Sequence, residues 1–123
     1  KAMIRKRIQI EGARVLIMGL SFKENCPDLR NTRVVDVIAE LRDYGMQVDV
    51  HDPWVDAGEA RQEYGLALTA TPEQGGYDAI VAAVAHREFR EGGAAAMRAL
   101  GREAHVLYDL KHIFAMGETD IRL

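Results

Sequence analysis

The sequence of 123 residues has one cysteine, three prolines, 7% aromatic residues and no long apolar run. The lone Cys26 excludes an internal disulfide framework and fits a reducing compartment, so we expect a cytoplasmic protein. Every apolar stretch is far shorter than the roughly 20 residues of a membrane span, so we expect no membrane segment. The four histidines lack the spacing of metal ligands, and no metal site is expected.

The first residues differ in charge from the rest of the chain. Residues 1–14 hold five basic side chains and one acidic, a net charge of +4, which leaves −7 for the remainder of a chain of net −3. An acidic body argues against nucleic-acid binding, so any anion site must be local. The basic start lacks an apolar stretch behind it, so no signal peptide is expected. Because the chain starts on Lys1 rather than methionine, we expect an upstream part.

Length and composition predict a single domain with its own apolar core. We assign 13–123 to that domain and interpret 1–12 as the end of a connecting helix, which leads into it from an upstream domain. Strands and helices are expected to alternate through the domain. The patterns predict strands over 14–19, 47–51, 66–69, 77–85 and 105–110, and helices over 32–44, 56–64 and 94–100.

This alternation predicts an α/β fold, a Rossmann-like three-layer domain with a parallel sheet of about five strands and helices on both faces. Asn31 or Thr32 can cap the first helix of the domain, and Gly45 is placed to end it. Ligands of such sheets bind at the carboxyl ends of the strands, near the point where the strand order reverses. The loops after Gly19 and Ala85 are therefore among those expected to form the site.

The loop after the first strand is unusual for a nucleotide-binding fold. The glycine-rich G-x-G-x-x-G turn is missing, and residues 20–31 form a long loop in its place. Lys23 and Arg30 bracket this loop beside a helix start, where backbone N–H groups already favour anions. A phosphate is one candidate ligand, with Asp28 orienting a cation. A surface cluster of salt bridges is the alternative, and spacing does not decide between them.

The same loop carries a family resemblance. The segment GLSFKENCPDLRNT over 19–32 resembles the signature that opens the C-terminal, UDP-binding domain of UDP-glucose/GDP-mannose dehydrogenases, G-x-x-F-K followed by D-x-R-x-S/T. Its E-N-C-P-D-x-R-N-T form is similar to the branch that acts on UDP-N-acetylglucosamine or UDP-N-acetylgalactosamine. The resemblance continues through 48–54, 77–89 and 108–111, and so covers nearly the whole chain.

The resemblance implies a larger enzyme. Members have an N-terminal NAD-binding domain, a central helical region and a C-terminal domain that binds the UDP-sugar. They oxidise the sugar C6 alcohol to a uronic acid with two NAD, for surface polysaccharide synthesis, and generally associate as homo-oligomers. The catalytic cysteine belongs to a G-G-x-C-x-P-K-D-type motif that this chain lacks. The resemblance therefore implies no catalytic residue here, and the chain alone is expected to be inactive.

Five residues receive roles through the resemblance. Phe22 and Lys23 fall on the pair that contacts the nucleotide sugar, and Lys111 falls near a basic position that approaches UDP. Arg30, helped by Asp28, falls on an arginine that reaches NAD, a cofactor held mainly by the N-terminal domain. The domain is thus expected to close a cleft between two nucleotides.

Three other residues have competing interpretations. Cys26 lies near two cations, but no Cys-His spacing supports a nucleophile, and we favour a family marker. Asp52 ends a strand where a Rossmann acid can hold a ribose, yet an Asp-Pro turn with Trp54 packed beneath is favoured without the glycine loop. His86 lies at the ligand-facing edge or simply starts a helix. The rival functions are a stand-alone NAD- or nucleotide-binding regulatory module, in which Asp52 decides affinity, and an interaction domain.

Overall fold

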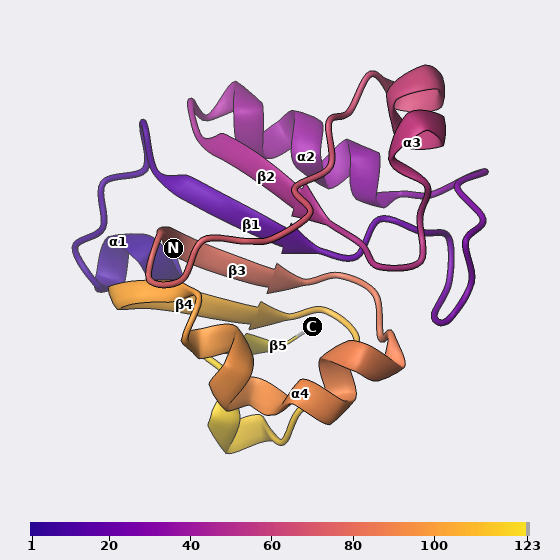
Figure 1. Ribbon diagram of the computed structural model, residues 1–123. Helices are drawn as coiled ribbons and strands as arrows, with labels where there is room; N and C mark the ends of the chain where they lie inside the picture. The colour runs from indigo at the N-terminus through magenta and orange to yellow at the C-terminus, as the bar shows by residue number, and fades with distance from the viewer. Residues whose placement is uncertain (123) are drawn as a thin grey trace.

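A computed structural model describes residues 1–122 and shows one parallel sheet of five strands in the order β2-β1-β3-β4-β5 (Figure 1). The strands are β1 (Arg14–Met18), β2 (Gln47–His51), β3 (Tyr77–Ala82), β4 (Gly101–Asp109) and β5 (Ile121–Arg122). The helices are α1 (Ala2–Arg5), α2 (Val34–Asp43), α3 (Ala57–Tyr64), α4 (Arg87–Arg98) and the short 3₁₀ helix η1 (Met116–Glu118). This arrangement confirms the predicted Rossmann-like α/β fold.

The sheet separates two apolar clusters, because successive strand residues point to opposite faces. Val15 and Ile17 of β1 pack with Ile38 of α2, in a cluster that also includes residues of α1 and α3. Leu16 and Met18 pack on the other face in a cluster that includes Phe89, Ala94 and Met97 of α4. The fold therefore has three layers, as the continuous apolar strands predicted.

The helix boundaries follow the expected local chemistry. The Thr32 hydroxyl accepts a hydrogen bond from the Val34 N–H (3.2 Å) and donates one to the Leu20 carbonyl (2.7 Å), so it binds the first N–H of α2 and ties the preceding loop to the helix, although the N-cap residue is Arg33. Gly45 follows the helix in the left-handed region, with φ of 83°. Helix α2 starts two residues later than predicted, and its N-cap is Arg33 rather than Asn31 or Thr32.

One predicted strand is wrong. Residues 66–69 do not form a strand, and only Leu68 makes an isolated parallel bridge, to Val50 of β2. The Thr69 N–H donates to the Val50 carbonyl at 2.7 Å, and three residues later Pro72 lacks the N–H that a longer ladder needs. The fifth strand of the sheet is instead β5, which the sequence patterns missed because two residues show no periodicity.

Two elements are longer than predicted. Strand β4 begins at Gly101 rather than at residue 105, because Gly101 pairs with Tyr77 before the register shifts and Val106 pairs with Ala79; the polar side chains between them are largely exposed. Helix α4 begins at Arg87 rather than at residue 94, and non-helical φ and ψ angles at Gly93 kink it. The second half of α4 is the predicted helix, and the first half follows directly from His86.

The leading segment is only briefly helical. Helix α1 covers four residues, and Lys6 after it reaches the far end of the chain, donating to Asp120 (3.0 Å) and to the His105 carbonyl (2.7 Å). Whether 1–12 connects two domains stays a prediction. Among residues 1–122, the helices are all too short or too polar to cross a membrane.

Candidate functional site

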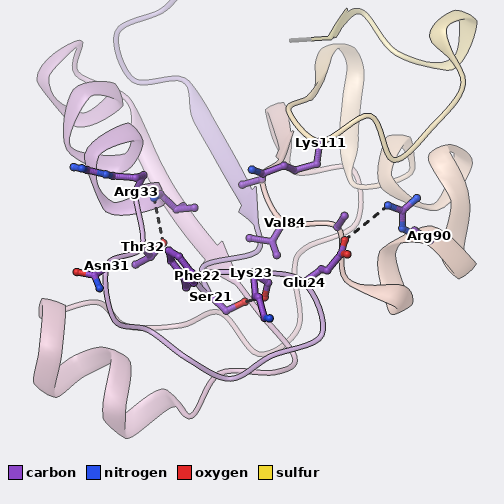
Figure 2. Close-up of a pocket in the computed structure, with 13 residues that line it drawn as sticks. Ser21, Phe22, Lys23, Glu24, Asn31, Thr32, Arg33, Val84, Arg90 and Lys111 are labelled. Carbon is purple, nitrogen blue, oxygen red and sulfur yellow. Dashed lines mark hydrogen bonds and ion pairs between the residues drawn. The ribbon is translucent and has the colours of Figure 1, made fainter.

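The strand order reverses beside β1, because the chain passes from β1 to β2 on one side and then to β3 on the other. A pocket of about 530 Å³ opens at the carboxyl ends of β1 and β3 (Figure 2). It is lined by Ser21, Phe22, Lys23, Glu24, Asn31, Thr32, Arg33, Val34, Ala83, Val84, Ala85, Arg90 and Lys111. The pocket therefore occupies the switch point at which ligands of such sheets bind.

All three residues that the sequence analysis assigned to substrate binding line this pocket. Phe22 and Lys23 come from the loop after β1, and Lys111 comes from the turn after β4. The Phe22 side chain is 55% exposed, unusual for a large apolar ring. Within the part of the chain that the structure describes, neither Lys23 nor Lys111 forms an ion pair. Both ammonium groups are thus available to an anion.

Two arginines that the sequence analysis did not name also line the pocket. Arg33 stands at the start of α2, and Arg90 lies in the first turn of α4, 3.9 Å from Glu24. The lining thus holds four basic side chains and one acidic, within a chain of net charge −3. Arg90 lies eight residues after the carboxyl end of β3 and in the first turn of α4, a position that correct prediction of α4 would have identified.

Asp28 and Arg30 do not join the pocket lining. Asp28 accepts hydrogen bonds from Arg30 at Nε (3.1 Å) and Nη2 (3.2 Å), and also from its backbone N–H (2.9 Å). These hydrogen bonds from Arg30 lower the pKa of Asp28. The Arg30 side chain is 86% exposed. The sequence analysis left a phosphate site and a surface cluster of salt bridges as alternatives for this loop. The observed geometry of Asp28 and Arg30 is that of a surface salt bridge.

Gly19 lets the pocket floor close. It has φ of 109°, and a Cβ atom placed on it would come within 2.6 Å of the Val84 Cβ. Only glycine allows β1 to leave the sheet this close to the chain after β3. The single glycine thus serves close backbone packing, although the glycine-rich turn is missing.

Asp52 lies beneath the loop rather than in the pocket. Its Oδ2 accepts from the backbone N–H groups of Leu20 (2.7 Å) and Ser21 (3.0 Å), and its Oδ1 from the Trp54 N–H (2.8 Å). His86 Nε2 is 2.9 Å from the same Oδ2. Burial raises the pKa of Asp52, but the hydrogen bonds from His86 and the three N–H groups outweigh burial and lower it. The predicted Asp-Pro turn is confirmed.

His86 and Cys26 contribute structure around the pocket. His86 is fully buried and precedes α4, so the interpretation as a helix start is confirmed. The Trp54 ring stacks on it at a centroid distance of 6.1 Å. Cys26 is a half-buried free thiol outside the pocket lining. Among residues 1–122, no group of three or more His, Cys, Asp or Glu side chains is arranged to hold a metal ion.

Comparisons with known proteins agree with this geometry. Residues 16–116 match the model of the UDP-glucose/GDP-mannose dehydrogenase family, UDP binding domain. The whole chain is 57% identical to the UDP-N-acetyl-D-glucosamine 6-dehydrogenase of Pseudomonas aeruginosa and 50% identical to the enzyme of the same name from Salmonella typhi. It spans 29% of the length of each of these curated relatives.

A solved structure gives the same fold. The NDP-N-acetyl-D-galactosaminuronic acid dehydrogenase of Methanosarcina mazei superposes with a TM-score of 0.81 over 99% of this chain and 26% of that one, at 22% identity. Together with the family match and the pocket at the switch point, this places the chain. It belongs to the UDP-glucose/GDP-mannose dehydrogenase family and corresponds to the UDP binding domain of its members.

Proposed function

We propose that this chain binds the nucleotide part of a UDP-sugar and is the C-terminal domain of an NAD-dependent UDP-sugar 6-dehydrogenase. The observation that carries the proposal is the local positive charge of the pocket: Arg33 and Arg90 pair with Asp36 and Glu24, but Lys23 and Lys111 form no ion pair within residues 1–122 of an otherwise acidic chain. A diphosphate is the part of the substrate that such a cluster recognises.

The pocket residues divide the work of binding. Lys23 and Lys111 enter from two different loops, and their ammonium groups neutralise the diphosphate from two directions. The exposed Phe22 ring supplies an apolar face for the uracil or the sugar. The contribution to turnover is positioning, because holding the substrate in one orientation removes the entropy cost of the encounter from the chemical step.

The NAD contact is proposed for Arg30. Its guanidinium is 86% exposed, and Asp28 engages only Nε and Nη2, so Nη1 can still donate to a phosphate held by another domain. NAD supplies hydride acceptance when bound, whereas this chain contributes only the contact. Asp28 keeps the guanidinium in a fixed plane, which suits two-pronged recognition of a phosphate.

For the sugar we propose UDP-N-acetyl-D-glucosamine, because two relatives that match the whole chain, at 57% and 50% identity, are UDP-N-acetyl-D-glucosamine 6-dehydrogenases by name. The complete enzyme is proposed to be a cytoplasmic homo-oligomer that makes uronic acids for surface polysaccharides. The interface with the upstream domains is proposed to include the side of the domain on which Arg30 is exposed.

The rival function, a stand-alone nucleotide-binding regulatory module, depends on Asp52 as the ribose contact. Both carboxylate oxygens of Asp52 already accept hydrogen bonds from within the domain, and the residue is 6% exposed. A ribose hydroxyl would have to displace the backbone of the loop. The geometry therefore favours the UDP-sugar assignment.

Three experiments test the proposal. Reading the coding sequence upstream of Lys1 should reveal a G-x-G-x-x-G domain followed by the cysteine motif, and their absence would favour the stand-alone module. Calorimetry on this chain should show weak binding of UDP and UDP-N-acetylglucosamine and none of NAD. In the complete enzyme, Lys23→Ala should raise KM for the UDP-sugar about tenfold, the loss of one charge-assisted contact. Unchanged KM and turnover would remove Lys23 from the site.

A further inference from the structure

Hydrogen bonds of Asn25 link the loop after β1 to the start of α4. The backbone N–H of Asn25 donates to His86 Nδ1 at 2.9 Å, and the Asn25 side-chain oxygen accepts from the Arg87 N–H at 2.8 Å. Arg87 is the first residue of α4, so Asn25 satisfies an N–H that the helix itself leaves unpaired. Asn25 has φ of 53°, a conformation that asparagine tolerates better than most residues.

The hydrogen bonds also define the state of the buried imidazole. Because Nδ1 accepts from the Asn25 N–H, the ring proton is on Nε2, which donates to Asp52 Oδ2 (2.9 Å) and lies 3.2 Å from the Ser21 hydroxyl. The Ser21 hydroxyl donates onward to the Lys23 carbonyl at 3.0 Å. We call His86, Asp52, Ser21 and Asn25 together the His86 clasp.

The clasp encloses the pocket residues of the loop. Phe22, Lys23 and Glu24 all line the pocket and lie between Ser21 and Asn25, the two points at which His86 holds the loop. The Ser21 bond to the Lys23 carbonyl reaches into this segment, so the backbone beneath the lysine is held directly. Figure 2 shows these three residues extending from the loop that the clasp supports.

The imidazole is rigidly seated. His86 and Asp52 side chains are both 0% exposed, and the His86 ring contacts Trp54 on one side and Phe89 at a centroid distance of 5.4 Å. A polar group buried this fully has no water to replace a lost partner. Removing the imidazole would therefore leave the Asn25 N–H and the Ser21 hydroxyl, both in the loop, short of a hydrogen-bond partner.

We infer that His86 is a positioning residue for the nucleotide sugar, which presents Phe22 and Lys23 to the pocket through the clasp. The inference rests on the proposed function for the ligand, but the geometry of the clasp is independent of it. The clasp needs one acceptor, at Nδ1, and one donor, at Nε2, and a neutral imidazole supplies both. A primary carboxamide also offers one acceptor and one donor, so glutamine can substitute in part.

Three variants of the chain test the inference. His86→Phe keeps an aromatic ring but removes both hydrogen bonds, whereas His86→Gln retains one acceptor and one donor. The control is His51→Gln, at another strand end, where Nδ1 lies 2.9 Å from the Thr69 carbonyl oxygen. By UDP titration followed by NMR, His86→Phe should bind about tenfold more weakly, and His86→Gln and His51→Gln within about threefold of the parent chain.

The same samples separate this inference from the proposed function. Amide hydrogen exchange over residues 22–25 should be at least about tenfold faster in His86→Phe, with α2 unchanged, whether or not UDP binds. A parent chain that binds no UDP, with this exchange pattern present, contradicts the proposed function and leaves the clasp standing. A folded His86→Phe with unchanged exchange and unchanged UDP affinity overturns the clasp.

Asn25 gives a second route if His86→Phe fails to fold. Asn25→Gly keeps the left-handed backbone but loses the side-chain oxygen, and Asn25→Asp keeps that oxygen. Asn25→Gly should weaken UDP binding about fivefold and Asn25→Asp less than twofold. Equal affinities for the two variants would show that the link to α4 does not position the loop.

Discussion

Asp120 should stabilise the fold above pH 4 and lose that effect in acid. The carboxylate lies just before β5 and accepts hydrogen bonds from the Leu107 N–H (2.8 Å), from Arg98 Nη1 (3.1 Å) and from Lys6 Nζ (3.0 Å). It therefore links the segment after α1, the end of α4 and strand β4. Replacing it with asparagine removes the charge and part of each contact while keeping the shape.

The magnitude follows from the pKa of Asp120. Burial raises this pKa, but the hydrogen bonds from Leu107, Arg98 and Lys6 outweigh burial and lower it from 3.8 to about 2. The difference corresponds to at most about 2.5 kcal/mol. Because the residue is partly exposed, screening by solvent reduces this contribution to about 1 kcal/mol. A depressed pKa stabilises the folded state above the unfolded value of 3.8, and the contribution disappears as the pH falls through about 2.

The assay is urea unfolding of the parent chain and Asp120→Asn at pH 7, 5, 3 and 2. At pH 7 and 5 the variant should lose about 1 kcal/mol of unfolding free energy, and the difference should shrink at pH 3 and below. Glu103→Gln, an exposed position on β4, is the control and should change stability by less than about 0.5 kcal/mol. Equal stabilities at pH 7, or a difference that persists undiminished near pH 2, would refute the reasoning.

The remaining predictions concern the pocket. Gly19→Ala should cost about 3 kcal/mol by thermal unfolding, because its Cβ would meet Val84 and its φ is 109°; a loss below about 1 kcal/mol would contradict the close approach. Lys111→Ala should weaken UDP binding about tenfold, and Arg90→Ala about fivefold with Arg90→Lys nearer the parent, measured by calorimetry at two salt concentrations. If Arg90→Ala binds like the parent, Arg90 lines the pocket without contacting the ligand. In the complete enzyme, Arg30→Ala should raise KM for NAD several-fold and leave KM for the UDP-sugar unchanged, and the opposite pattern would reverse the assignment.

The sequence by itself determined the layers of the fold and most of its elements. Apolar runs such as 14–19 and 77–85 mark strands buried on both faces, because a parallel sheet covered by helices needs apolar side chains on each side. The hydrogen bond of Thr32 to the first N–H of α2 and the end of α2 at Gly45 were also predictable, since both depend on local backbone chemistry. The loop over 19–32 identified the family, and Phe22, Lys23 and Lys111 indeed line one pocket.

Only the tertiary structure decided how distant residues meet. The isolated bridge at Leu68 and the two-residue strand β5 depend on pairing with other strands, which local periodicity does not encode. Arg90 lines the pocket and Arg30 lies outside it, because the positions of both depend on how α4 and the loop after β1 pack. The role of His86 was hidden for the same reason: its partners lie 34, 61 and 65 positions away in the chain, and only the folded sheet brings them within hydrogen-bond distance.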